Sequence, residues 1–190
     1  MRNATAAAPT ASAEHPIVQP GSALHVLLAD GSGAEIRYAE QGDRGAVRAM
    51  HAEMSPDNRY LRFFSLSLQG PEQEARRMCR PAARDHVALL AVIAGRLAGA
   101  ASYELVAATG HAEIAFAVAD HLHGHGIATL LLEQLVAVGQ RNGVRVFDAE
   151  TLPENYQMQH VLAAAGLPTE RHSLDGEVDI ALSLTGAGRA

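Results

Sequence analysis

Apolar residues in the first half of the chain recur at two different spacings. Two short apolar runs, residues 24–28 and 34–38, flank the turn Asp30-Gly31-Ser32-Gly33, and this arrangement predicts a β-hairpin. The spacing then becomes helical, and it is interrupted by Ser55-Pro56 and by Pro81. The pattern therefore predicts three helices, over residues 43–54, 58–64 and 71–80.

The second half of the chain predicts a run of strands followed by alternating elements. Three apolar runs joined by short glycine-bearing turns predict an antiparallel meander over residues 86–93, 97–106 and 112–118. After it we expect a helix over 126–141, a strand over 144–151, a helix over 155–165 and a strand over 178–184. This order predicts one α+β (mixed α/β) domain without internal repeats.

Composition sets the limits of that domain. Residues 1–22 mix Ala, Thr, Ser and Pro without apolar periodicity, so we expect a disordered leader, followed by the domain over 23–185 and a tail over 186–190. With 190 residues, of which 48% are hydrophobic, the chain is long enough to bury one core. The neighbouring aromatic residues Tyr60, Phe63 and Phe64 are expected to belong to that core.

Charge and cysteine content argue against several classes of protein. The formal net charge is −6 and the basic residues do not cluster, which argues against nucleic-acid binding. No apolar run reaches the roughly 20 residues of a membrane span, and the chain does not begin like a signal peptide, so we expect a cytoplasmic protein with no membrane partner. The only cysteine, Cys79, cannot form an internal disulfide or a cysteine metal cluster.

Residues 112–129 carry the most informative chemistry: a strand, a glycine-bearing loop and the start of an amphipathic helix. A helix that begins at glycines presents free backbone N–H groups and the positive end of its dipole, which suits a phosphate or pyrophosphate. A P-loop would need a lysine, and all 15 basic residues are arginine. A dinucleotide fold would place the glycines after the first strand of a parallel unit rather than after a meander. His121, His123 and His125 alternate, but alternation aligns metal ligands only on a strand, so no metal site is predicted.

The loop His123-Gly124-His125-Gly126-Ile127-Ala128 resembles the coenzyme A loop of the GCN5-related N-acetyltransferases (GNAT), whose pattern is Gln/Arg-x-x-Gly-x-Gly/Ala. The match falls on Gly126 and Ala128, and His123 stands where the family has Gln or Arg. Four further segments, at 27–32, 54–65, 112–120 and 149–158, resemble one branch of that superfamily, the bacterial protein lysine acetyltransferases that act on acyl-CoA synthetases.

The resemblance implies a fold, a co-substrate and a set of binding residues. The fold is a central, mostly antiparallel mixed sheet, flanked by helices, whose fourth and fifth strands in the family's count splay apart. The co-substrate is acetyl-CoA, with no metal, and the Val118 N–H is implied to polarise the thioester carbonyl. The residues implied to bind acetyl-CoA are Phe116, Ala117, Val118, His123, Gly124, His125, Gly126, Ile127, Ala128, Thr129 and Asn155.

The acceptor amine needs a base, because an ammonium with a pKa of about 10.4 must lose a proton before it can attack. Glu113 has apolar neighbours in its strand, where desolvation would raise a carboxyl pKa; a structural pair with an arginine is the alternative. The resemblance implies that Glu113 is the general base. Many relatives carry a tyrosine seven residues after Asn155 that protonates the thiolate; here that residue is Leu162, and Tyr156 is expected on the wrong helical face.

Residues and resemblance together predict an acetyl-CoA-dependent protein lysine N-acetyltransferase in which the lysine amine attacks the thioester directly. The expected partner is a protein bearing the target lysine, an acyl-CoA synthetase in particular. Two alternatives stay open: a small-amine N-acetyltransferase, and a non-catalytic acyl-CoA-sensing module. Under the first hypothesis the absence of lysine would mean that the enzyme cannot acetylate its own side chains.

Overall fold

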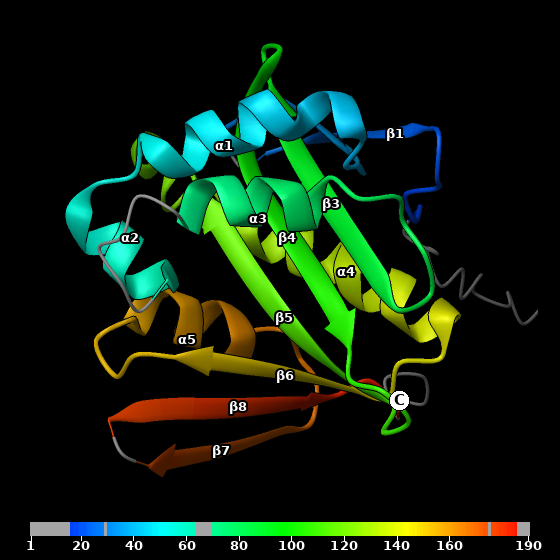
Figure 1. Ribbon diagram of the computed structural model, residues 1–190, viewed down its shortest axis with the longest axis vertical. Coiled ribbons are helices and arrows are strands. Elements are labelled where there is room, and N and C mark those ends of the chain that lie inside the picture. Colours follow the sequence, from blue (N-terminus) through cyan, green and yellow to red (C-terminus); the bar gives the residue numbers. More distant parts are fainter. Residues whose placement is uncertain (1–15, 29, 64–69, 175, 186–190) are drawn as a thin grey trace, which may run out of the picture.

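The computed structural model describes residues 16–28, 30–63, 70–174 and 176–185. Within these residues, eight strands form one sheet in the order β1-β2-β3-β4-β5-β6-β8-β7 (Figure 1). All neighbouring strands are antiparallel except β5 and β6, which are parallel. The strands are β1 (Ala23–Leu27), β2 (Gly33–Tyr38), β3 (His86–Ile93), β4 (Arg96–Leu105), β5 (His111–Val118), β6 (Val146–Thr151), β7 (Thr169–Leu174) and β8 (Glu177–Ser183).

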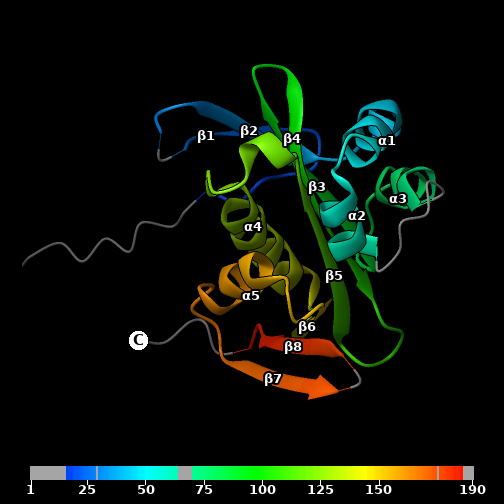
Figure 2. The same ribbon diagram turned by 90° about the vertical axis from the view of Figure 1, so that its left-hand side faces the viewer.

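Helices lie on both faces of the sheet (Figure 2). On one face lie α1 (Arg44–Ala52), α2 (Pro56–Phe63) and α3 (Gly70–Met78), and on the other lie α4 (Ile127–Asn142) and α5 (Tyr156–Ala163). The helices of the first face cover the half of the sheet around β3, β4 and β5. Over β6, β8 and β7 the same face carries no helix of the described chain, as Figure 1 shows.

The described residues form two hydrophobic cores, one on each face of the sheet. The larger core lies under α4 and α5 and contains the fully buried Leu131 and Phe147. The smaller core lies under α1 and α3 and contains Val47 and Met78. Because strand side chains alternate between faces, β3, β4 and β5 contribute to both cores, and this fixes their register.

β5 and β6 part after a short paired stretch. They pair only over His111–Glu113 of β5, although β5 continues to Val118. On the other side of β5, the N–H of Ala119 donates to the carbonyl of Ala98 (2.9 Å), and that of Val106 donates to His111 (2.8 Å). Antiparallel bonding alternates, so the backbone groups of Phe116 and Val118 point away from β4 and into the gap. The predicted splay of these two strands is therefore confirmed.

The structure confirms the predicted hairpin, the three early helices, the meander and the α4 helix. It adds β7, an edge strand that the sequence analysis missed because all six of its residues are exposed and do not alternate. Residues 16–18, assigned to the leader, pack against α4: Val18 is 2% exposed, and its N–H donates to Gln134 (2.9 Å). Tyr60 is exposed rather than in the core, and Phe64 and the Phe63 side chain lie outside the described part of the chain.

Gly99 of β4 lets the start of α4 approach the sheet closely. A Cβ built on it would lie 2.9 Å from Ile127 Cγ2 and 3.2 Å from the Ala117 carbonyl oxygen. The Ala117 oxygen belongs to the adjacent strand and cannot move away without disturbing the ladder. The absence of a side chain at Gly99 therefore sets the height of the α4 N-terminus above β4 and β5.

Gly99→Ala should lower the free energy of unfolding by about 1–3 kcal/mol, the usual cost of overpacking, as measured by urea denaturation. Gly45→Ala is the matched control, because Gly45 lies on α1 and a Cβ added to it would meet nothing within 4 Å. There the change should be neutral or stabilising by up to about 1 kcal/mol. Equal effects of the two substitutions would contradict the close approach.

Candidate active site

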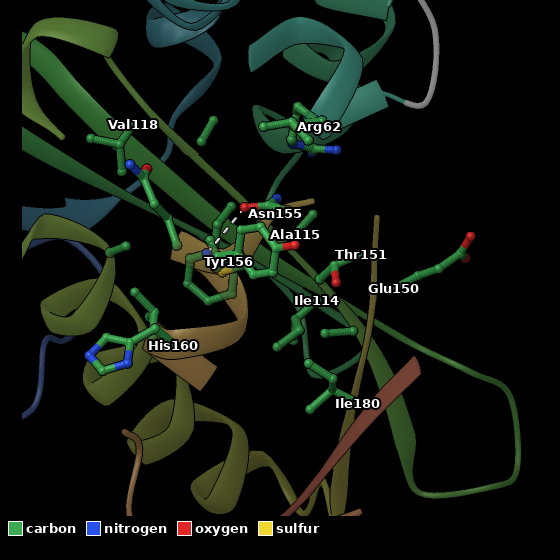
Figure 3. Close-up of a pocket in the computed structure, with 18 of the residues that line it drawn as sticks. Arg62, Ile114, Ala115, Val118, Glu150, Thr151, Asn155, Tyr156, His160 and Ile180 are labelled. Atoms are coloured by element: carbon green, nitrogen blue, oxygen red, sulfur yellow. Dashed lines mark hydrogen bonds between the residues drawn. The ribbon is translucent and has the colours of Figure 1, made fainter. Parts of the chain in front are cut away.

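A large cavity opens where β5 and β6 part. Its volume is about 1120 Å³. Its walls come from the diverging ends of β5 and β6, the start of α4, the start of α5, and α2 on the opposite side (Figure 3). The cavity therefore lies where the sheet leaves backbone groups unpaired and where two helices begin.

The structure brings the sequence-predicted site residues together around this cavity. Glu113 lines it, as do all the residues predicted to bind acetyl-CoA except His125. His125 instead has its Nδ1 3.1 Å from the His123 carbonyl oxygen and its Nε2 3.9 Å from a carboxylate oxygen of Asp30. His123 turns back toward β5, with its Nε2 3.0 Å from the Val118 carbonyl oxygen.

The N-terminus of α4 is exposed to the cavity through a glycine. Gly126 has a φ of +80°, in the left-handed region, and a Cβ added to it would project into open space. At this end the Leu130 N–H donates to the Gly126 carbonyl (3.0 Å), so the N–H groups of Ile127, Ala128 and Thr129 precede the helical ladder. Three such donors with the helix dipole behind them fit the pyrophosphate of a coenzyme A molecule.

Glu113 stands at the last paired position between β5 and β6, opposite Asp148. Its side chain is exposed, so the expectation that burial among apolar neighbours would desolvate it is wrong. The face of the sheet toward which it points is not covered at this position. The arginine pair considered as its alternative role is also not among the ion pairs of the described residues; its neighbour Glu104 has such partners, Arg80 and His86.

Guanidinium groups from α2 and α3 line the side of the cavity opposite β6 and β8. Arg62 and Arg77 both bind the buried carboxylate of Glu74, Arg77 at 2.9 Å. Burial alone would raise the pKa of Glu74, but the two guanidinium groups hold it below its ordinary value. Burial would lower the pKa of Arg77, yet the charges of Glu74, Glu104 and Glu113 raise it. This wall is therefore cationic.

The start of α5 forms another part of the cavity wall. Asn155 caps the helix, because its side chain accepts a hydrogen bond from the Met158 N–H (3.2 Å), and it also faces the cavity. Leu162, at the position of the family's tyrosine, is fully buried. As expected, Tyr156 is on a different face of the helix from Leu162: it is 74% exposed and lines the cavity beside Asn155 (Figure 3).

Several cavity residues were missed by the sequence analysis. Glu150 of β6, Asp179 of β8 and the two arginines Arg62 and Arg77 all line the cavity. They come from four segments that are far apart in the sequence and that only the sheet order and the α2–α3 packing bring together. An exposed carboxylate alternating with buried residues along β6 was the one available signal for Glu150.

The thiol of Cys79 is not suited to act as a covalent nucleophile. The residue is 4% exposed in the smaller core, and burial raises its pKa to about 11. A thiol that is both buried and protonated does not attack a thioester. Among the residues that the structure describes, no group of three or more His, Cys, Asp or Glu side chains could hold a metal ion, and none of the helices has the length and apolar composition of a membrane span.

Asp120 connects the two sides of the cavity. It lies in η2 (Asp120–Leu122), the turn between β5 and α4, and its Oδ2 accepts a hydrogen bond from the Ser55 N–H (2.8 Å) just before α2. Partial burial would raise the pKa of Asp120, but hydrogen bonds from Ser55 and Asn58 hold it below the ordinary value. The loop before α4 and the α2 wall are therefore held in one arrangement.

Comparison with known proteins identifies the family. Residues 47–167 match the model of the acetyltransferase (GNAT) family. The GNAT domain of S. lividans PAT is 30% identical with a TM-score of 0.77, over 85% of this chain and 96% of that one. The structure of yncA from Salmonella typhimurium with its cofactor acetyl-CoA is 18% identical with a TM-score of 0.58, over 82% of this chain and 96% of that one.

A third similar structure is longer. The cAMP-binding acyltransferase from Mycobacterium smegmatis is 19% identical with a TM-score of 0.58, over 86% of this chain and 47% of that one. This chain therefore spans about half the length of that protein. The chain belongs to the GNAT acetyltransferase family: it has the fold and the splayed strands of an acyltransferase that uses acetyl-CoA.

Asp120→Ala should loosen the loop before α4 and the turn before α2 together. Loss of hydrogen bonds to a charged group predicts a decrease of about 1–3 kcal/mol in the free energy of unfolding. The KM for acetyl-CoA should rise several-fold, as steady-state kinetics would show. Asp57→Ala is the control, because Asp57 is exposed in the first turn of α2. An unchanged KM in Asp120→Ala would show that the loop does not need this contact.

Proposed function

We propose that the protein is an acetyl-CoA-dependent protein lysine N-acetyltransferase, with an acyl-CoA synthetase as its acceptor. The observation that carries the proposal is that one cavity joins the glycine-led N-terminus of α4, the unpaired edge of β5 and the carboxylate Glu113. Acetyl-CoA supplies an activated acetyl thioester there. The 30% identity to the GNAT domain of S. lividans PAT favours the branch that the sequence motifs resemble.

The backbone of β5 and the first turn of α4 are the groups that we assign to acetyl-CoA. Phe116 directs its N–H and C=O groups into the gap, and Val118 its N–H, so the amides of a pantetheine arm can bond to them as an added strand. The Val118 carbonyl already has His123 Nε2 at 3.0 Å. The N–H groups of Ile127, Ala128 and Thr129 suit the pyrophosphate. The Val118 N–H is suited to stabilise negative charge on a carbonyl oxygen.

Glu113 acts on the acceptor. It takes a proton from the lysine ammonium, directly or through water, and the neutral nitrogen forms the new C–N bond at the thioester carbonyl. The C–S bond then breaks, and the nitrogen loses its second proton to water as the amide forms. A thiol leaving group with a pKa of about 8.5 can depart as thiolate, so the burial of Leu162 in place of a tyrosine does not block the reaction. Because Cys79 is buried and protonated, the acetyl group passes to the amine without an acyl-cysteine intermediate.

The surroundings of the cavity favour a protein acceptor. The face of β6, β8 and β7 beside it carries no helix of the described chain (Figure 1), and its residues alternate between buried and exposed along β6 and β8. A lysine on the surface of a folded protein can therefore reach Glu113 from this side. An enclosed site, by contrast, would admit only a small molecule.

Glu113→Gln should lower kcat/KM for acetylation of a purified acetyl-CoA synthetase by about 10²–10⁴-fold, the usual contribution of a positioned base. Binding of CoA, measured by calorimetry, should change less than twofold because the CoA-binding groups are elsewhere in the cavity. Mass spectrometry of the synthetase should find acetylation of a lysine with wild type and not with the variant.

Glu133→Gln serves as the control, because Glu133 is exposed on α4 and does not line the cavity. If the wild-type protein acetylates spermidine but not the synthetase, the acceptor is a small amine and not a protein. Full activity of Glu113→Gln would show that Glu113 is not the base. CoA binding by the wild-type protein without any acetyl transfer would favour a sensing module.

A further inference from the structure

A second carboxylate, Glu150, stands on the opposite side of the gap from β5. β5 and β6 run parallel and Glu113 is opposite Asp148, so Glu150 is level with Ala115. Along the strands, the backbone of Glu150 is therefore nearer than that of Glu113 to the Val118 end of the gap. Its side chain is exposed and lines the cavity. Figure 3 shows this side chain at the outer edge of the cavity, away from the Val118 side chain.

The charges around Glu150 are predominantly negative. Glu150 is opposite Asp179 of β8, which is in turn opposite His172 of β7, and Glu113 and Asp148 lie on the same face. Partial desolvation raises the pKa of Glu150, as do the charges of Glu177, Asp179 and Glu113 and a hydrogen bond with Glu177. A cation placed here would relieve this repulsion.

Two other carboxylates near the cavity, Glu74 and Glu104, have arginine partners. Glu74 binds Arg62 and Arg77, and Glu104 binds Arg80. Among the described ion pairs, none includes Glu150. The cavity thus has a guanidinium wall on the α2–α3 side and an uncompensated carboxylate on the β6 side, and a positively charged amine is driven toward the latter.

We infer that Glu150 binds the ammonium group of the acceptor at the entrance of the gap and so makes the site selective for a cationic amine. This rests on the proposed function and assigns its acceptor-binding residue. Glu150 holds the acceptor nitrogen between the two strands, and Glu113 takes its proton. No bond to Glu150 forms or breaks, so the stoichiometry of the transfer is unchanged.

Glu150→Gln should raise the KM for the synthetase and for spermidine about tenfold, because a charge-assisted contact is lost. The KM for acetyl-CoA should change less than twofold. Glu150→Asp should recover part of the loss, and Glu133→Gln should behave as wild type. A wild-type acceptor KM in Glu150→Gln overturns the inference, as does an equal rise in both KM values, which would mark a structural role.

Glu177, which does not line the cavity, allows a second test through the pH dependence of kcat/KM. Glu177→Gln removes a negative neighbour, which lowers the pKa of Glu150, so the acid limb of kcat/KM for the acceptor should move to lower pH by several tenths of a unit. The same substitution in Glu150→Gln should leave the acid limb where it was. A shift that persists in the double variant overturns the inference.

The outcomes also separate this inference from the proposed function. Wild-type turnover with spermidine alone rejects the protein acceptor, and the Glu150 variants are then judged on spermidine. Wild-type turnover with the synthetase and no effect of Glu150→Gln rejects Glu150 alone. No turnover with either amine, while CoA binds, overturns both.

Discussion

The parting of β5 and β6 is the constraint on which the rest of the structure depends. Backbone N–H and C=O groups inside a sheet are costly to leave unpaired, yet the N–H and C=O of Phe116 and the N–H of Val118 point into a gap. The gap stays open because each strand is held firmly elsewhere: β5 by seven paired positions with β4, and β6 by six with β8. The sheet thus keeps a strand-shaped gap without losing its order.

The helices extend this constraint into a binding site. Gly99 allows α4 to begin close above β4 and β5, so its N-terminal N–H groups open into the same cavity as the gap. Asp120 holds the preceding loop to the turn before α2, and Glu74 holds Arg62 and Arg77 on the next wall. Anion-binding backbone groups and cationic side chains are therefore in place on these walls of the cavity before any ligand enters, which lowers the entropy lost on binding.

Sequence reasoning succeeded where chemistry and periodicity coincide within one segment. The strand, loop and helix of residues 112–129 are continuous, so their roles could be assigned before their positions were known. It failed where the order of the strands in the sheet decides whether a residue is buried or reaches the cavity. Apolar neighbours suggested a buried Glu113, but neighbours within a strand do not reveal whether a helix covers the face it points to. β7 carries no apolar period, and Glu150 reaches the cavity only through the parallel register of β5 and β6.

The carboxylates beside the gap also oppose the unwanted strand pairing to which an open strand edge is prone. Unpaired edges attract strands of other chains, and charged side chains pointing across an edge oppose such pairing. Glu113, Asp148 and Glu150 lie at this edge, and Asp179 and Glu177 follow on the next strand. An extended peptide entering from that side would bury these charges, whereas an ammonium group would neutralise them. The same negative charge can therefore exclude an unwanted strand and admit a lysine side chain, leaving the β5 edge to the pantetheine arm.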